Sequence, residues 1–248
     1  MNRADTACCF SIKITQFRAV CPYFSDDEAW RLWGQEGRIN LDVEYKPLLA
    51  FLPAMQRRRL GIAARLAFDA AWPLVEQYSN IPLVFVSHDG ELNRSFELWL
   101  ALLREGTVSP TSFGLSVHNA LPGQWSMLRG DMSENTALSV CCDGLETALA
   151  EAYVLLGEGH SRVLVVVADD PLRKEYPVVA TRAPFAYAMA MMVEEGNEYV
   201  FSMLPAAPKA KSDLPVYEGA LDWLKFLHSD AEEHIQDYGI RRWLWQKK

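Results

Sequence analysis

Short apolar segments alternate along the chain with longer segments of mixed polarity. Alternating or continuous apolar runs are typical of strands, and they occupy residues 10–17, 81–87, 136–140 and 163–167. Apolar residues with helical spacing are typical of helices that bury one face, and they occupy residues 26–33, 54–78, 91–104, 119–128 and 145–156. Strands that alternate with helices predict an α/β layered domain.

Local signals refine the ends of these elements. Ser25 precedes an acidic first turn and is expected to cap the helix over 26–33, while Pro73 is expected to kink or shorten the helix over 54–78. Residues 184–194 and 199–204 predict two strands joined in a hairpin at 195–197. A linker over 206–215, a helix over 216–228 and a charged edge strand in the last residues complete the prediction.

Composition narrows the classes of function. The chain has 248 residues, of which 50% are hydrophobic, so it can bury a large core. Its net charge of −8 argues against nucleic-acid binding. No apolar run reaches the length of a membrane span, and the N-terminus does not resemble a secretion signal. Five cysteines, an odd number, favour reduced thiols and a cytoplasmic location.

The central stretch 109–170 contains the candidate chemistry. A strand over 136–140, a helix over 145–156 and a strand over 163–167 form one βαβ unit, which predicts two parallel strands in one sheet. Cys142 lies where the first strand meets the helix. Because a helix N-terminus favours an anion, a thiol at that position ionises more easily. Acyl chemistry would also require a general acid or base and an oxyanion hole.

The same stretch resembles the N-terminal half of β-ketoacyl synthases. The resemblance rests on Ser109-Pro110, Asn119, Gly123, Gly130, the strand-ending Cys142 and Asp169, with Cys142 at the nucleophile position. The segments LPAMQRRRLGIAARLAFDAA, SPTSFGLSVHNALPGQWS and ADDPLRKEYP resemble more closely a short β-ketoacyl synthase-like family. That family includes chain-length-factor subunits of bacterial aryl-polyene polyketide pathways.

This resemblance implies a half, truncated thiolase-type fold, layered α-β-α with a mixed central sheet. It implies one domain over 1–248, with a core at about 10–205 and a C-terminal helix and strand over 216–248. The expected role is that of a non-catalytic subunit without a cofactor. Such a subunit forms a heterodimer with a full-length β-ketoacyl synthase, shapes its acyl tunnel and meets acyl carrier protein mainly through that partner.

Two departures from the ketosynthase pattern favour a non-catalytic role. Cys142 is followed by Asp143, which places a carboxylate beside the thiol and opposes its ionisation. The family's two catalytic histidines lie in the second half of its fold, and none of the five histidines here has their sequence context. Cys142 is therefore either a vestigial packing residue or the nucleophile of an acyltransferase or thioesterase, with His118 or a partner histidine as base. A third alternative is a stand-alone homodimeric scaffold that binds acyl carrier proteins.

The resemblance also indicates where a partner binds. The strand before the nucleophile pairs across the dimer in this family, so the expected partner-facing residues are Ser116, Val117, His118, Asn119, Thr136, Ala137, Leu138, Ser139 and Val140. The basic run Arg57, Arg58 and Arg59 is either a docking site for an acidic carrier protein or a solvated helix turn. Asp169-Asp170 is interpreted as a strand-end turn, and no metal site is expected.

Overall fold

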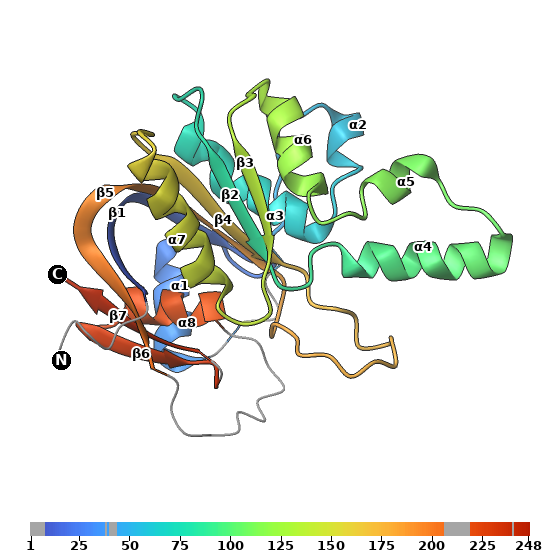
Figure 1. Cartoon of the computed structure of the whole chain (residues 1–248). Helices are drawn as coiled ribbons and strands as arrows, with labels where there is room; N and C mark the ends of the chain where they lie inside the picture. Colours follow the sequence, from blue (N-terminus) through green and yellow to red (C-terminus); the bar gives the residue numbers. More distant parts are fainter. Residues whose placement is uncertain (1–7, 38, 40–43, 206–218, 240) are drawn as a thin grey trace.

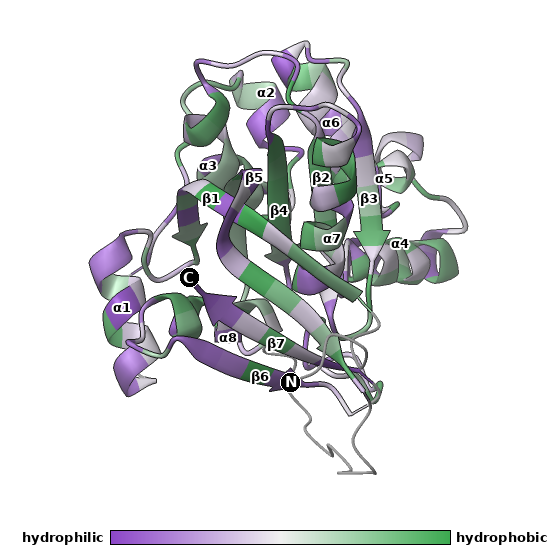
Figure 2. Cartoon of the chain, turned by 60° about the vertical axis from the view of Figure 1, so that its left-hand side comes forward, coloured by the Kyte–Doolittle hydropathy of each residue, from purple (hydrophilic) through white to green (hydrophobic). Residues whose placement is uncertain are grey.

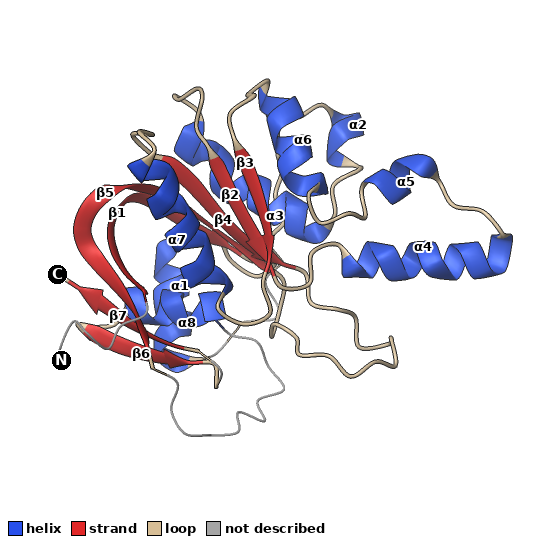
Figure 3. Cartoon of the chain, viewed as in Figure 1, coloured by secondary structure: helices blue, strands red, loops and turns tan. Residues whose placement is uncertain are grey.

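The computed structural model describes residues 8–37, 39, 44–205, 219–239 and 241–248. Strands are β1 (Cys8–Val20), β2 (Leu83–Ser87), β3 (Asn135–Ser139), β4 (Val163–Asp169), β5 (Tyr187–Leu204), β6 (Glu233–Asp237) and β7 (Arg242–Lys247). Helices are α1 (Asp27–Glu36), α2 (Ala54–Arg57), α3 (Ile62–Val75), α4 (Leu92–Glu105), α5 (Pro110–Gly114), α6 (Ala120–Arg129), α7 (Gly144–Gly157) and α8 (Gly219–Leu227). Figures 1 and 3 show them packed around a single sheet.

The sheet has seven strands and is mixed. Its strand order is β3-β2-β4-β5-β7-β6, and β1 also pairs with β5. β2 runs parallel to both β3 and β4, whereas β5 runs antiparallel to β4, β1 and β7. The predicted βαβ unit is therefore confirmed as parallel, although β2 lies between its two strands.

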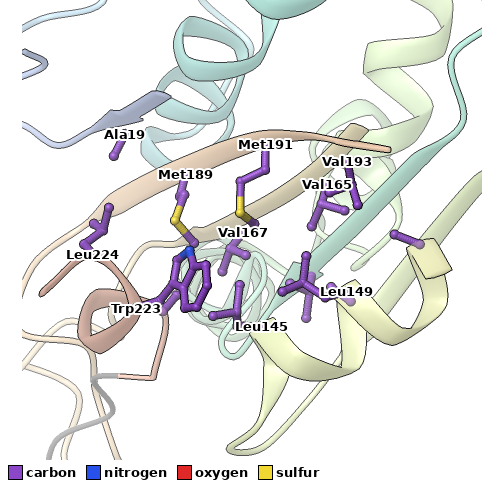
Figure 4. Packing of buried hydrophobic residues seen from close by; sticks show 14 of the residues in the cluster. Ala19, Leu145, Leu149, Val165, Val167, Met189, Met191, Val193, Trp223 and Leu224 are labelled. Carbon is purple, nitrogen blue, oxygen red and sulfur yellow. The ribbon is translucent and has the colours of Figure 1, made fainter. Parts of the chain in front are cut away.

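Helices cover both faces of the sheet. Successive side chains of a strand point to opposite faces, and in the central strands the side chains on both faces are apolar and need to be buried. In β4, Val163, Val165 and Val167 belong to the core under α7 and α8, whereas Leu164 and Val166 belong to the core under α3. Figure 4 shows the first of these cores, where Trp223 of α8 lies beside Met189 and Leu145. Burial on both faces explains the continuous apolar runs in the sequence.

The hairpin predicted at 195–197 is wrong. Residues 187–204 form one long, bent strand, β5, and both of its halves pair with β1 instead of with each other. The register shifts where Ile12 pairs with Tyr199 and Lys13 pairs with Glu194, so residues 195–198 form a bulge. The turn-like Glu-Gly-Asn signal marks this bulge, where Gly196 lies so close to β1 that an added Cβ would be 2.5 Å from the Lys13 Cβ.

The C-terminal strand is also placed differently from the prediction. β7 lies inside the sheet, between β5 and β6, and is not an edge strand. β6 is the outer strand on that side and carries mostly polar residues (Figure 2). Alternation in β7 buries Trp243 and Trp245 on one face, which a solvent-guarded edge would not need. The predicted linker and the start of the helix at 216 lie outside the described residues.

Two smaller predictions differ at helix ends. The α1 N-cap is Asp26 and not Ser25, since the Asp26 side chain accepts a hydrogen bond from the Ala29 N–H at 2.9 Å. The long helix expected over 54–78 is divided into α2 and α3, and Pro73 lies inside α3. These differences leave the fold class unchanged: it is α/β with helices on both faces of a mixed sheet, as expected. No described helix is long and apolar enough to cross a membrane.

Candidate functional site

The candidate site lies at the carboxyl ends of the parallel strands β2, β3 and β4. The Val140 N–H points to the Ser87 carbonyl at 3.4 Å, so the end of β3 stays attached to β2 as far as Val140. Asp143 is the N-cap residue of α7, without a side-chain capping hydrogen bond, and Cys142 directly precedes it. The sequence therefore places Cys142 at the strand-to-helix junction, as predicted.

The surroundings of Cys142 oppose thiolate formation. Its Sγ atom lies 3.8 Å from the Asp143 carboxyl oxygen Oδ1. Burial and the neighbouring Asp143 charge raise the pKa of the Cys142 thiol, and Arg241 offsets this only in part. A nucleophilic thiolate needs the opposite shift. Free Cys142 at neutral pH is therefore mainly a thiol.

Two buried acidic side chains follow Cys142 at the start of α7. Asp143 and Glu146 are fully buried. Asp143 pairs with Arg241 at 2.7 Å and accepts the Trp243 indole N–H at 3.1 Å. Glu146 accepts the Trp245 indole N–H at 2.9 Å, and burial raises its pKa to about 8. The partners of both carboxylates come from the C-terminal hairpin.

His118 joins the two segments expected to face a partner. Its Nε2 atom donates a hydrogen bond to the Leu138 carbonyl of β3 at 2.8 Å. Its Nδ1 atom faces Gly90, where an added Cβ would lie only 2.8 Å away. His118 is thus engaged in holding β3. No hydrogen bond between His118 and Cys142 is found among the described residues.

A polar cluster behind the site is fully occupied by structural contacts. The Asp169 Oδ1 atom accepts the Ser87 hydroxyl at 2.8 Å and the His88 N–H at 2.7 Å, and Oδ2 accepts the Tyr187 hydroxyl at 3.2 Å. Asn93 accepts the Arg173 N–H at 2.9 Å, which fixes the loop after β4. Asp169 therefore closes a strand end. Among the described residues, no group of three or more potential metal ligands is found.

One side of β3 has no strand partner among the described residues, because β3 is the outer strand beside β2. Helix α4 projects from the same end of the sheet (Figure 1). Its residues Trp99 and Leu103 are 56% and 65% exposed, and Phe113 of α5 is 60% exposed. Predicted partner residues Val117, Asn119 and Ser139 are exposed as well.

A loop after β4 braces α4 from one side. Tyr176 stacks on Phe96 with ring centroids 4.5 Å apart, and Arg173 pairs with Glu97 at 2.7 Å. The helical spacing of α4 had predicted a helix that buries its apolar face, yet Asn93 is its one buried residue. Pattern alone could not show that much of this apolar surface remains exposed.

The three arginines of the basic run differ in their surroundings. The Arg57 guanidinium donates hydrogen bonds to the backbone carbonyls of Leu48 and Leu49 at 3.4 and 3.3 Å, so it stabilises the loop that precedes α2. Arg58 and Arg59 are exposed. Among the residues that the structure describes, no such contact is found for the Arg58 and Arg59 side chains. Carrier-protein docking at the run stays a prediction.

Comparison with known proteins places the chain among ketosynthase-like domains. Residues 30–246 match the family described as "Beta-ketoacyl synthase, N-terminal domain". A search of curated proteins finds no significant match. The two solved structures described next are less than 25% identical to this chain, so they support the fold alone.

Two solved structures illustrate the similarity. A chain from the ketosynthase ApeO in complex with its chain length factor ApeC, from Xenorhabdus doucetiae, matches with a TM-score of 0.82 and 24% identity, over 96% of this chain and 100% of that one. The ishigamide ketosynthase/chain length factor matches with a TM-score of 0.62 and 13% identity, over 78% of this chain and 67% of that one. The expected half-ketosynthase fold is confirmed.

Proposed function

This chain belongs to the β-ketoacyl synthase N-terminal-domain family, and we propose that it is the chain-length-factor-type partner of a full-length β-ketoacyl synthase. The observation that carries the proposal is that one side of β3 has no strand partner among the described residues, while α4 and α5, near the same end of the sheet, carry exposed apolar residues (Figure 1). An exposed strand edge beside an apolar surface is a site for pairing with another chain.

The residues of this surface suit a lasting complex. Trp99, Leu102, Leu103, Phe113 and Val117 are large apolar side chains that would be costly to keep in water. Aromatic side chains are common at the centres of stable interfaces. A partner that covers β3 together with α4 would bury an obligate-type interface of roughly 2,000 Å² or more.

The chemistry near Cys142 supports a subunit that does not catalyse. The raised pKa of Cys142 and the hydrogen bond of His118 to Leu138 argue against Cys142 as an activated nucleophile. The partner would supply the decarboxylative Claisen condensation of a malonyl-carrier protein with the growing acyl chain. This chain would complete the dimer and shape the acyl tunnel near the interface. Aryl-polyene synthesis is the proposed pathway, because the sequence segments quoted above resemble a family that includes chain-length-factor subunits of such pathways.

Carrier protein would meet this complex mainly through the ketosynthase. Exposed Arg58 and Arg59 are the part of the basic run that could add a contact to an acidic carrier protein. Exchanging both for glutamate should then slow carrier association without affecting the heterodimer. Unchanged association would assign the run to a solvated helix turn.

The first experiment is co-expression with a full-length β-ketoacyl synthase from the same organism, followed by size-exclusion chromatography with light scattering. We expect a one-to-one complex and a chain that is poorly soluble or self-associated when alone. Leu103→Glu should abolish the complex. Val154→Glu is the matched control, since Val154 is 53% exposed on α7 and lies outside the proposed surface.

Three results would contradict this function. A stable monomer that ignores the ketosynthase would exclude the subunit role. A homodimer that binds carrier protein without the ketosynthase would support the scaffold alternative. Loss of product formation by the reconstituted complex after Cys142→Ala would support the enzyme alternative, whereas unchanged product formation would exclude it.

A further inference from the structure

We propose that the C-terminal hairpin, β6 and β7, locks strand β3 in its partner-binding conformation by holding the buried carboxyl groups of Asp143 and Glu146. The inference rests on the proposed function, because it concerns the same partner surface. It adds a mechanical role for the hairpin, which lies in the sheet far from β3.

The first contact is an ion pair at the start of α7. Arg241, in the turn between β6 and β7, places its guanidinium 2.7 Å from Asp143 Oδ1. Trp243 donates to Asp143 Oδ2 at 3.1 Å, across 100 residues of sequence. The Asp143 side chain has no exposure to water, whereas that of Arg241 is 41% exposed. Hairpin atoms therefore bind both oxygens of a carboxylate that water cannot reach.

The second contact is made by Glu146, three residues after Asp143. Tyr238 places its hydroxyl 3.2 Å from both Glu146 oxygens, and Trp245 donates its indole N–H to Oε1 at 2.9 Å. Trp243 and Trp245 stand two residues apart on one strand, so both point to the same face of β7. The hairpin thus grips the first turn of α7 at two successive points.

The buried ion pair of Asp143 with Arg241 makes this grip specific. Removing one partner of a buried ion pair leaves an unpaired charge in the protein interior, which is strongly destabilising. Replacing both partners avoids that charge. The first turn of α7 therefore keeps its position only while the hairpin is docked, or after the carboxylate itself is neutralised.

The position of this turn controls the end of β3. Only Val140, Cys141 and Cys142 connect Ser139, the last residue of β3, to Asp143. Val140 is already tied to Ser87 of β2. A connection this short spans at most about 14 Å when extended, so it limits how far Asp143 can move away from Ser139. A displaced Asp143 pulls on Ser139 and Leu138, which face the proposed partner.

The test compares two adjacent arginines of the hairpin. Arg241→Gln removes the pair with Asp143. Arg242→Gln is the matched control, because Arg242 pairs with Asp237 inside the hairpin at 3.2 Å. With purified ketosynthase as the probe, we expect Arg241→Gln to raise the Kd about tenfold or more, and Arg242→Gln to leave it within about twofold. Asp143→Asn combined with Arg241→Gln should restore binding, since no unpaired carboxylate remains.

Amide hydrogen exchange over residues 139–147 of the free chain provides a readout that needs no partner. We expect faster exchange there in Arg241→Gln than in Arg242→Gln. Equal ketosynthase binding by the two single variants would overturn the lock, and so would a double variant that binds as weakly as Arg241→Gln. If the unmodified chain binds no ketosynthase, the proposed function fails, and equal exchange in the two variants would then overturn the grip on α7 itself.

Discussion

The indole Nε1 atom of Trp245 lies 2.9 Å from the Glu146 oxygen Oε1 and donates a hydrogen bond to it, although 99 residues separate the two in sequence. Both side chains are fully buried. This hydrogen bond thus joins the last strand of the chain to the helix that follows Cys142. It also places an acidic group in the core, with consequences for pH dependence.

The stability of the chain should fall as pH rises from about 4.5 to about 8 because of Glu146. Burial raises the pKa of Glu146 from 4.5 to about 8, with Asp143 adding to the shift and Trp245 and Tyr238 opposing it. The folded chain thus keeps a proton that the unfolded chain releases. The Glu146 contribution is fully present below about pH 4.5 and is lost as pH rises through about 8. Glu146→Gln should flatten this slope in urea unfolding measured from pH 5 to 9.

The control for this measurement lies on the same helix. Glu151 is half-buried and accepts a hydrogen bond from Thr136 at 3.2 Å. Glu151→Gln should leave the slope between pH 5 and 9 in place. An unchanged slope in Glu146→Gln would mean that Glu146 is already ionised in the folded chain.

Cys142 should react slowly with iodoacetamide at neutral pH. Burial and the charge of Asp143 raise its pKa above the ordinary value of 9.0. Alkylation of Cys142, followed by peptide mass spectrometry, should therefore accelerate steadily between pH 7 and 10. Asp143→Asn should speed it at every pH in this range, because it removes the like charge.

A contrary result would be a rate that is already at its plateau at pH 7. It would indicate a thiolate and revive the enzymatic alternative. The rate at Cys141, which is exposed, serves as the internal comparison.

Gly90→Ala should destabilise the chain more than the same change at Gly106. Both glycines have positive φ, 56° and 70°, where an L side chain costs roughly 1–2 kcal/mol. Only at Gly90 would the added Cβ meet another residue, since it would lie 2.8 Å from His118 Nδ1. The extra loss at Gly90 should appear in the free energy of unfolding. Weaker ketosynthase binding should accompany it, because His118 holds Leu138. Equal losses for the two variants would show that His118 shifts without cost.

Gly196→Ala should weaken the bulge between β1 and β5. An added Cβ would lie 2.5 Å from the Lys13 Cβ, which neither backbone can avoid without moving. Overpacking of this kind typically costs about 1–3 kcal/mol. Thermal unfolding should show the loss, with Gly157→Ala as the control, because a Cβ at Gly157 would meet nothing within 4 Å. A melting temperature equal to that of the control would mean that the bulge relaxes freely.

Much of the fold was accessible from the sequence because its central strands are buried on both faces. Continuous apolar runs located β2 and β4, and helical spacing located α4, α6 and α7 to within one or two residues. The resemblance around Cys142 also identified the family. These features are local, since each depends on residues that are neighbours along the chain.

Tertiary structure decided the remaining features, because they depend on residues that are distant in sequence. Residues 187–204 pair with β1 as one bent strand where a hairpin was predicted. β7 pairs with both β5 and β6, so it lies inside the sheet and not at the predicted edge. Folding brought Arg241 and Trp243 to Asp143. The exposure of Trp99 and Leu103 is also a property of the packed chain. An amphipathic pattern shows that a helix has an apolar face, but only packing determines whether this chain covers that face.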